Sequence, residues 1–108
     1  RKAEWQKVVG VWDKVVSFIN DPKTQPEALK IMAARVGVPA ESYAAFLKGT
    51  KLLTLKEGAA IMAKGDGFKS LHGSSKIADD FNVANDVYKK AQPIDGYIDA
   101  SLTNAAAK

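Results

Sequence analysis

One histidine is the first residue in this sequence that could do chemistry. His72 could act as a general base or bind a metal ion, because the imidazole ring titrates near neutral pH. A catalytic triad or a zinc site needs further ligands or partners, yet the chain contains no cysteine and no second histidine. Glycines and serines surround His72 between residues 65 and 75. We therefore expect a solvated or turn-capping histidine in a loop.

Two further motifs invite a chemical interpretation. Asp79 and Asp80 are neighbours, and neighbouring side chains on a helix diverge by about 100°, so they cannot form a paired acid/base site. We expect both carboxylates on a solvated helix face. The Gly-Asp-Gly run at residues 65–67 resembles the start of a phosphate loop, but Ser70 replaces the third glycine and no Gly-Lys-Ser/Thr follows. The sequence thus predicts a turn there, and no catalytic, cofactor-binding or metal-binding residue.

Composition narrows the class of protein. Hydrophobic residues make up 46% of the 108 residues and charged residues 26%, which excludes a disordered chain. No apolar run approaches the roughly 20 residues that span a bilayer. Sixteen basic and twelve acidic residues give a net charge of +4, and the basic residues are spread along the chain. That spread argues against a nucleic-acid-binding surface, which needs a dense basic stripe.

The spacing of apolar residues predicts an all-α chain of five or six short amphipathic helices, as a single helical domain or fragment over residues 1–108. The expected helices cover about residues 2–20, 25–36, 39–48, 55–64 and 71–84. Residues 85–108 read as a tail with a short terminal helix, which Asp99 caps. Period-two alternation occurs only at residues 51–55, the one candidate for a short strand.

Five residues predict where helices begin and end. Thr24 and Thr54 each open a capping box, in which a hydroxyl at the cap is followed three residues later by an acid. Gly37 and Gly49 are expected to end helices. Asn85 is expected to end the helix over 71–84 by adopting a positive φ, which asparagine tolerates.

The first predicted helix carries large apolar side chains. Trp5 and Trp12 lie seven residues apart within a continuous apolar stripe, which favours a place in the core. Val11 and Phe18 lie outside that stripe, so the apolar arc is wide and calls for partners on several sides. On later helices the residues expected to face inward are Tyr43, Phe46, Leu47, Leu71, Ile77, Ala78, Phe81 and Ala84. Phe68 is expected to anchor the loop that begins at Gly65.

The order of these motifs resembles the C-terminal part of the substrate-binding proteins of ABC importers. The most similar group is the nitrate/sulfonate/taurine-type family, which is related to thiamine-precursor-binding proteins. The resemblance covers almost the whole chain. It rests on Trp12 and on residues 18–22 (FINDP), 26–33 (PEALKIMA), 36–43 (VGVPAESY), 46–55 (FLKGTKLLTL), 70–81 (SLHGSSKIADDF), 85–88 (NDVY) and 98–102 (IDASL).

This resemblance implies the C-terminal helical part of a type II periplasmic-binding-protein fold, in which two α/β lobes close on a solute. It implies a periplasmic or extracytoplasmic receptor, free or lipid-anchored, that serves a membrane permease and binds a small anionic solute. Such ligands lie between the lobes, so we assign no ligand-binding residue, no cofactor and no enzyme activity to this helical part.

Two other classes of function remain open from the sequence. The chain could be a free-standing helical interaction module that binds a partner, or a second copy of itself, through exposed apolar helix faces such as that of Trp5 and Trp12. A small basic nucleic-acid-binding domain ranks lower, because the basic residues do not cluster. An enzyme related to the pyrimidine-synthesising members of the family would need a histidine-rich site, which a chain with one histidine lacks.

Overall fold

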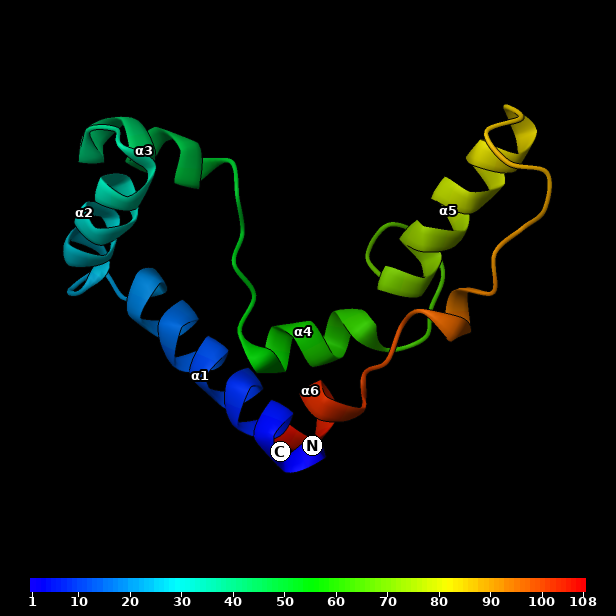
Figure 1. Ribbon diagram of the computed structural model, residues 1–108, viewed down its shortest axis with the longest axis horizontal. Coiled ribbons are helices and arrows are strands. Elements are labelled where there is room, and N and C mark those ends of the chain that lie inside the picture. The colour runs from blue at the N-terminus through cyan, green and yellow to red at the C-terminus, as the bar shows by residue number, and fades with distance from the viewer.

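The structure, a computed structural model, describes residues 1–108 and confirms the all-α prediction (Figure 1). It contains six α-helices, one short 3₁₀ helix (η1) and no strand. The elements are α1 (Lys2–Asn20), α2 (Gln25–Val36), α3 (Ala40–Lys48), α4 (Leu55–Met62), α5 (Leu71–Ala84), η1 (Ile94–Gly96) and α6 (Ser101–Ala106). Three helices have the bounds that the sequence predicts, while α3 begins one residue later and α4 ends two residues earlier.

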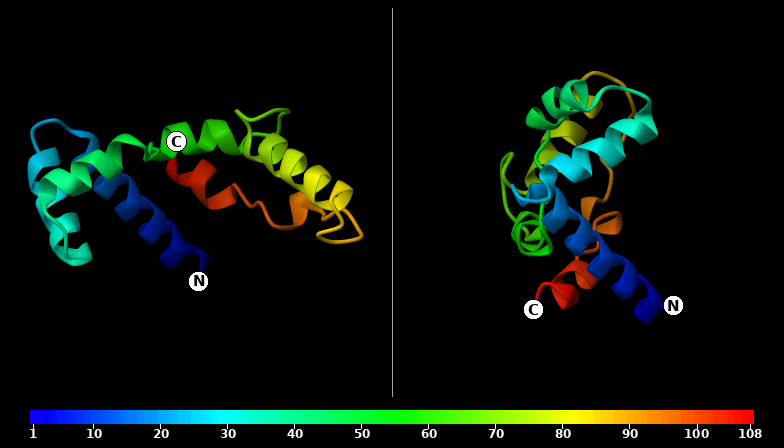
Figure 2. Two further views of the ribbon diagram at one scale, coloured as in Figure 1. Left: turned by 90° about the horizontal axis from the view of Figure 1, so that it is seen from above. Right: turned by 90° about the vertical axis from the view of Figure 1, so that its left-hand side faces the viewer.

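The helices form an open V (Figure 1). One arm holds α1, α2 and α3, the other holds α5, and α4 and α6 lie at the base; the turned views show the same separation of the arms (Figure 2). The radius of gyration is 17.2 Å, whereas a compact domain of this length has about 13 Å. The accessible surface is 8113 Å², against about 5,800 Å² for a compact protein of this mass. The chain therefore leaves much of its surface uncovered by its own helices.

The buried core is small and lies mainly where α1 meets α2. Val16 is completely buried, and Ile19 is nearly so. Ala28 and Ala33 on α2 are also buried. Leu55 at the start of α4 is the remaining buried apolar residue. Burial is thus concentrated at the end of α1 that precedes the turn into α2.

The predicted core position of the two tryptophans is wrong. The exposed fractions of Trp5 and Trp12 are 54% and 50%. The reason is that α1 contacts α2 near one end and α6 near the other, and no helix covers the side between them. The expectation that α1 presents apolar residues over a wide arc agrees with this uncovered side.

Several other apolar side chains expected to face inward are also exposed. The structure leaves Phe46, Phe68 and Phe81 largely in solvent, and Leu71 and Ile77 are only partly covered. Helical periodicity is present in α5, but no second helix lies along its outer side (Figure 1). A periodic stripe predicts which face is apolar and does not show that the same chain covers it.

One of the two predicted capping boxes is confirmed. The Thr54 hydroxyl accepts the N–H of Glu57 at 3.3 Å, and the Glu57 carboxylate accepts the N–H of Thr54 at 3.0 Å. The predicted box at Thr24 is wrong, because its hydroxyl donates to the backbone oxygen of Phe18 at 2.6 Å. Thr24 therefore fastens the turn between α1 and α2 instead of capping α2.

The positive φ expected of Asn85 belongs to its neighbour. Asn85 has φ −100°, whereas Asp86 has φ 58°. The Asn85 side chain donates to the Phe81 oxygen at 2.8 Å, so it caps the end of α5 by a hydrogen bond. Gly37 ends α2 in the left-handed region as predicted. Asp99 accepts the N–H of Ser101 at 2.9 Å one residue before the backbone N-cap of α6.

The strand candidate at residues 51–55 does not form part of a sheet. Residues 51–54 run between α3 and α4 without regular structure, and α4 begins at Leu55. Figure 1 shows this stretch as an extended trace without a neighbouring strand.

None of the helices combines the length and hydropathy that crossing a bilayer requires.

Candidate functional site

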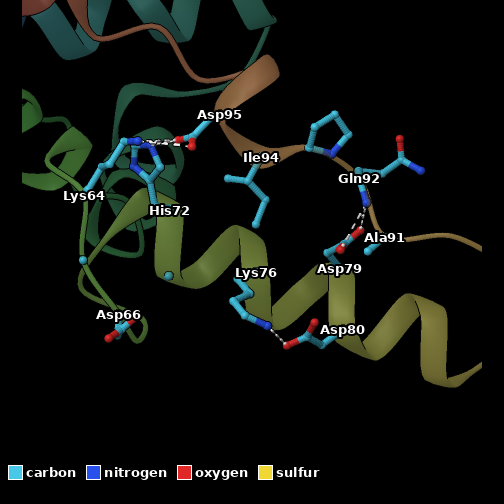
Figure 3. Close-up of a pocket in the computed structure, with 13 residues that line it drawn as sticks. Lys64, Asp66, His72, Lys76, Asp79, Asp80, Ala91, Gln92, Ile94 and Asp95 are labelled. Carbon is cyan, nitrogen blue, oxygen red and sulfur yellow. Dashed lines mark hydrogen bonds and ion pairs between the residues drawn. The ribbon is translucent and has the colours of Figure 1, made fainter.

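A polar pocket of about 660 Å³ lies between α5 and the chain that precedes and follows it (Figure 3). One wall is the side of α5, a second is the turn at residues 64–66, and a third is the segment 91–95. The charged and ionisable side chains that line it are Lys64, Asp66, His72, Lys76, Asp79, Asp80 and Asp95.

The turn at residues 65–67 forms as predicted and is built around the start of α5. Ser70 is the N-cap of α5, and its hydroxyl accepts the Gly73 N–H at 3.4 Å and donates to the Ala63 oxygen at 3.1 Å. A Cβ atom on Gly73 would collide with the backbone of Asp66 and Gly67. Gly73 is therefore required because the preceding turn packs directly against it.

His72 lies in the helix predicted over residues 71–84, and not in the solvated loop expected from its glycine and serine neighbours. It is the second residue of α5, and its side chain is only 14% exposed. Its Nε2 lies 3.4 Å from Oδ1 of Asp95, and the ammonium of Lys64 lies 3.1 Å from the same oxygen. The other ring nitrogen, Nδ1, is buried without a hydrogen-bond partner. Lys64 thus joins η1 to the turn before α5 through the Asp95 carboxylate, and the His72 ring lies beside the same carboxylate.

Asp79 is also not the solvated residue that the sequence predicts. It is 4% exposed, and its Oδ1 accepts the hydroxyl of Tyr88 at 2.6 Å and the backbone N–H of Gln92 at 3.0 Å. The Tyr88 hydrogen bond, followed by that of Gln92, lowers the pKa of Asp79 from its usual value. The same bond raises the pKa of the Tyr88 hydroxyl. Asp79 therefore fastens the segment after α5 back onto the helix.

Asp80 has a different partner from Asp79, as their divergence on a helix predicts. Its Oδ2 lies 2.6 Å from the Lys76 ammonium, in an exposed pair one helical turn apart. The pair raises the pKa of Lys76, chiefly through this hydrogen bond. Figure 3 shows Lys76 and Asp80 meeting on one side of α5 while Asp79 reaches Gln92 on another. The two carboxylates do not share a site.

The polar side chains of the pocket therefore mainly join neighbouring segments of the chain through hydrogen bonds and salt bridges. Lys64 is paired with Asp95 and Lys76 with Asp80, so both lysines that line it already have carboxylate partners. No three acidic or histidine side chains converge in a way that could hold a metal ion. The hydrogen bonds and ion pairs in the pocket attach residues 88–95 to α5.

A second concavity, of about 490 Å³, is mainly apolar and lies between α1, residues 51–55, α4 and α6. We call it the apolar groove. It is lined by Val8, Val9, Trp12, Lys51, Leu52, Leu53, Thr54, Leu55, Gly58, Met62 and Thr103. At its edge Oδ1 of Asp13 accepts the Leu55 N–H at 2.8 Å, which joins α1 to the start of α4. Sequence reasoning missed this groove because its walls come from four separate parts of the chain.

The exposed apolar residues of α1 form one continuous surface beside this groove. They recur at helical spacing and are each more than two-fifths exposed: Trp5, Val8, Val11, Trp12 and Val15. We call this set the α1 apolar face. Contiguous apolar surface of this kind is typical of sites that contact another surface.

No protein-family model, curated protein or solved structure matches the chain. The resemblance to substrate-binding proteins of ABC importers therefore stays a prediction from the sequence.

Proposed function

We propose that this chain is the helical region of a solute-binding receptor that serves an ABC-type importer of the nitrate/sulfonate/taurine kind. In this proposal its helices cover an α/β body in the periplasmic or extracytoplasmic space. The complete receptor, rather than these helices, binds a small anionic solute and delivers it to a membrane permease. The supporting sequence motifs run in order along almost the whole chain.

The observation that carries the proposal is the large uncovered surface. The accessible area exceeds that of a compact protein of the same mass by about 2,300 Å². That excess is in the range of permanent interfaces, which bury about 2,000 Å² or more. The α1 apolar face lies on this uncovered surface, as expected for helices that pack against a larger body.

The polar pocket supports a non-catalytic role. Asp79, Asp95 and Lys64 bind neighbouring parts of the chain. A solute site between two lobes needs a closing surface that excludes water. The V of helices leaves both concavities open, so the proposal places the solute in the α/β body.

Two experiments test this function. The coding sequence upstream of Arg1 should encode two α/β lobes that follow a secretion signal. The complete polypeptide should gain thermal stability with taurine, an alkanesulfonate or nitrate, whereas the 108-residue chain should gain none. Saturable stabilisation of the 108-residue chain by one of these solutes, or an upstream sequence without lobes, would show the proposal to be wrong.

A dye experiment tests the surface itself. The 108-residue chain should enhance the fluorescence of the hydrophobic dye ANS, because the α1 apolar face is open to solvent. Trp12→Glu should reduce this enhancement, while the control Lys7→Glu should leave it unchanged. In the complete receptor the enhancement should be absent.

A free-standing interaction module is the second candidate, and the α1 apolar face favours it as well. In that case the open reading frame would begin at or near Arg1, and the chain would associate with a partner or with itself. Sedimentation of the 108-residue chain over a range of concentrations distinguishes self-association from binding to a partner. Only self-association depends on the concentration of this chain alone.

A further inference from the structure

The extended segment between α3 and α4 has backbone groups without partners. The N–H groups of Lys51, Leu52 and Leu53 form no hydrogen bond within the chain, in contrast to those of Thr50 and Thr54. The carbonyl groups of Lys51 and Leu53 are also free. Because the segment is exposed or half-buried, water can pair with these groups, and a bound partner could replace that water.

The one bond that the segment does form shows which edge is free. The carbonyl oxygen of Leu52 accepts the side-chain amide of Asn20, at the end of α1, at 3.3 Å. In an extended strand the N–H and C=O of one residue point to the same edge, and those of the next residue point to the opposite edge. Lys51 and Leu53 therefore present four unpaired groups on the edge away from Asn20. This is the hydrogen-bonding pattern of an open strand edge.

Charge near the segment is strongly one-sided. Lys48, Lys51 and Lys56 lie within nine residues that contain no acid. Lys51 pairs with Glu57 at 3.4 Å, whereas Lys48 and Lys56 are exposed and have no salt bridge. Unpaired lysines at both ends of a strand edge complement a partner strand with acidic residues at its ends.

The segment also forms one wall of the apolar groove. Leu52 and Leu53 line it, and Trp12 lies across from them on α1. Side chains on adjacent strands lie side by side on each face of a sheet. Because neighbouring side chains on a strand point to opposite faces, an added strand would place every second side chain next to one of these two leucines, which calls for apolar residues at alternate positions.

We propose that residues 50–53 bind an extended peptide strand by β-augmentation, with Lys51 and Leu53 forming the hydrogen bonds. The bound strand has apolar residues at alternate positions and acidic residues at its ends. In this mode the main-chain bonds supply affinity and the neighbouring apolar wall supplies selectivity. The inference goes beyond the proposed function, because it concerns one edge of this chain and not the solute.

The test uses the ¹⁵N-labelled 108-residue chain and an acetylated, amidated probe peptide, Glu-Val-Thr-Val-Thr-Val-Glu. Hydrogen exchange is followed by NMR at single amides. With the peptide bound, the amides of Lys51 and Leu53 should exchange more slowly, while that of Leu52 should not change. A control peptide with proline as its central residue should bind more weakly, because proline cannot donate to a strand ladder.

Two proline variants provide a matched comparison. Leu53→Pro removes an outward N–H and should weaken peptide binding about fivefold, the effect of one lost hydrogen bond. Leu52→Pro removes an equal side chain and an inward N–H, so binding should stay within about twofold of the parent chain. Both prolines suit an extended backbone, and proline also favours an extended residue before it.

Three results would overturn the inference. One is a peptide that leaves the exchange of Lys51 and Leu53 unchanged. A second is binding that Leu53→Pro does not weaken more than Leu52→Pro, as expected for a helix in the groove. A third is protection of these amides that rises with chain concentration without peptide, which would assign the edge to a second copy. Failure of the proposed function would appear separately, in the upstream coding sequence and the solute titrations.

Discussion

The hydroxyl of Tyr88 donates a 2.6 Å hydrogen bond to Oδ1 of Asp79, nine residues earlier on α5. The backbone N–H of Gln92 reaches the same carboxylate at 3.0 Å. The buried Asp79 side chain therefore binds two points, Tyr88 and Gln92, of the segment that runs back along α5. That return positions η1, where Asp95 meets His72 and Lys64.

Removal of the Tyr88 hydroxyl should loosen this return segment. Tyr88→Phe leaves Asp79 with only the Gln92 bond, so the amide of Gln92 should exchange with solvent faster than in the parent chain. Tyr97→Phe is the matched control, because Tyr97 is exposed and its hydroxyl forms no hydrogen bond within the chain. Equal exchange of Gln92 in the two variants would contradict this role of Tyr88.

The same contact should depend on pH at both extremes. The pKa of Asp79 is lowered in the folded chain, so its contribution to stability is complete above about pH 4 and is lost as pH falls further. The pKa of Tyr88 is raised, so its contribution is present below about pH 10 and is lost at higher pH. Amide exchange at Gln92 should therefore be slowest, relative to an unfolded peptide at the same pH, between these limits. Asp79→Asn should remove the acid limit, and a limit that persists in this variant would assign it to another group.

Two valines of α1 should differ sharply in their contribution to stability. Val16→Ala removes a completely buried side chain and should lower the free energy of unfolding by about 2 kcal/mol. Val11→Ala, at a position 58% exposed, should change it by less than about 0.5 kcal/mol in the 108-residue chain. Urea unfolding followed by far-ultraviolet circular dichroism measures both. Equal losses would mean that the α1 apolar face is covered in solution.

The capping box at the start of α4 should have a measurable effect. Thr54→Ala removes the hydroxyl that accepts the Glu57 N–H and should lower the free energy of unfolding by about 1 kcal/mol. Thr50→Ala changes an exposed threonine whose side chain forms no hydrogen bond within the chain. Urea titrations should show a shifted midpoint for the first variant only.

Two helical glycines should respond to alanine in opposite directions. Gly73→Ala places a methyl group against the backbone of Asp66 and Gly67 and should displace the turn from α5. Gly10→Ala adds a methyl group in open space and should stabilise α1 by up to about 1 kcal/mol. Thermal unfolding of the two variants gives the comparison, and a stabilising Gly73→Ala would show that the turn does not pack as described.

Local signals in the sequence were sufficient to predict where the helices lie, but not which parts of the chain contact them. Apolar spacing and the stops at Gly37 and Gly49 predicted α2 and α3 closely, because helix boundaries depend on neighbouring residues. Thr24 carries the same local signal as Thr54, yet its hydroxyl bonds to Phe18. The choice between a cap and a turn depends on the tertiary path of the chain, which a four-residue motif does not contain.

In the candidate site, too, the sequence predicted the local structure but not the contacts between residues that are apart in the chain. His72 was predicted to be solvated because glycines and serines surround it, and Asp79 because it cannot form a paired site with Asp80 on a helix. Their actual partners, Asp95 and Tyr88, lie well downstream and become neighbours only when the chain turns back after α5. The predicted burial of the two tryptophans was wrong for the opposite reason. Periodicity predicted that their helix face is buried, but no part of this chain covers that face.

The contact between α1 and α6 bears on how the chain is made. The Gln6 side chain donates to the Leu102 oxygen, across a separation of 96 residues. During synthesis at the ribosome α1 therefore emerges long before the residues of α6 that contact its first turns. The start of α1 stays without this partner until nearly the whole chain has been made.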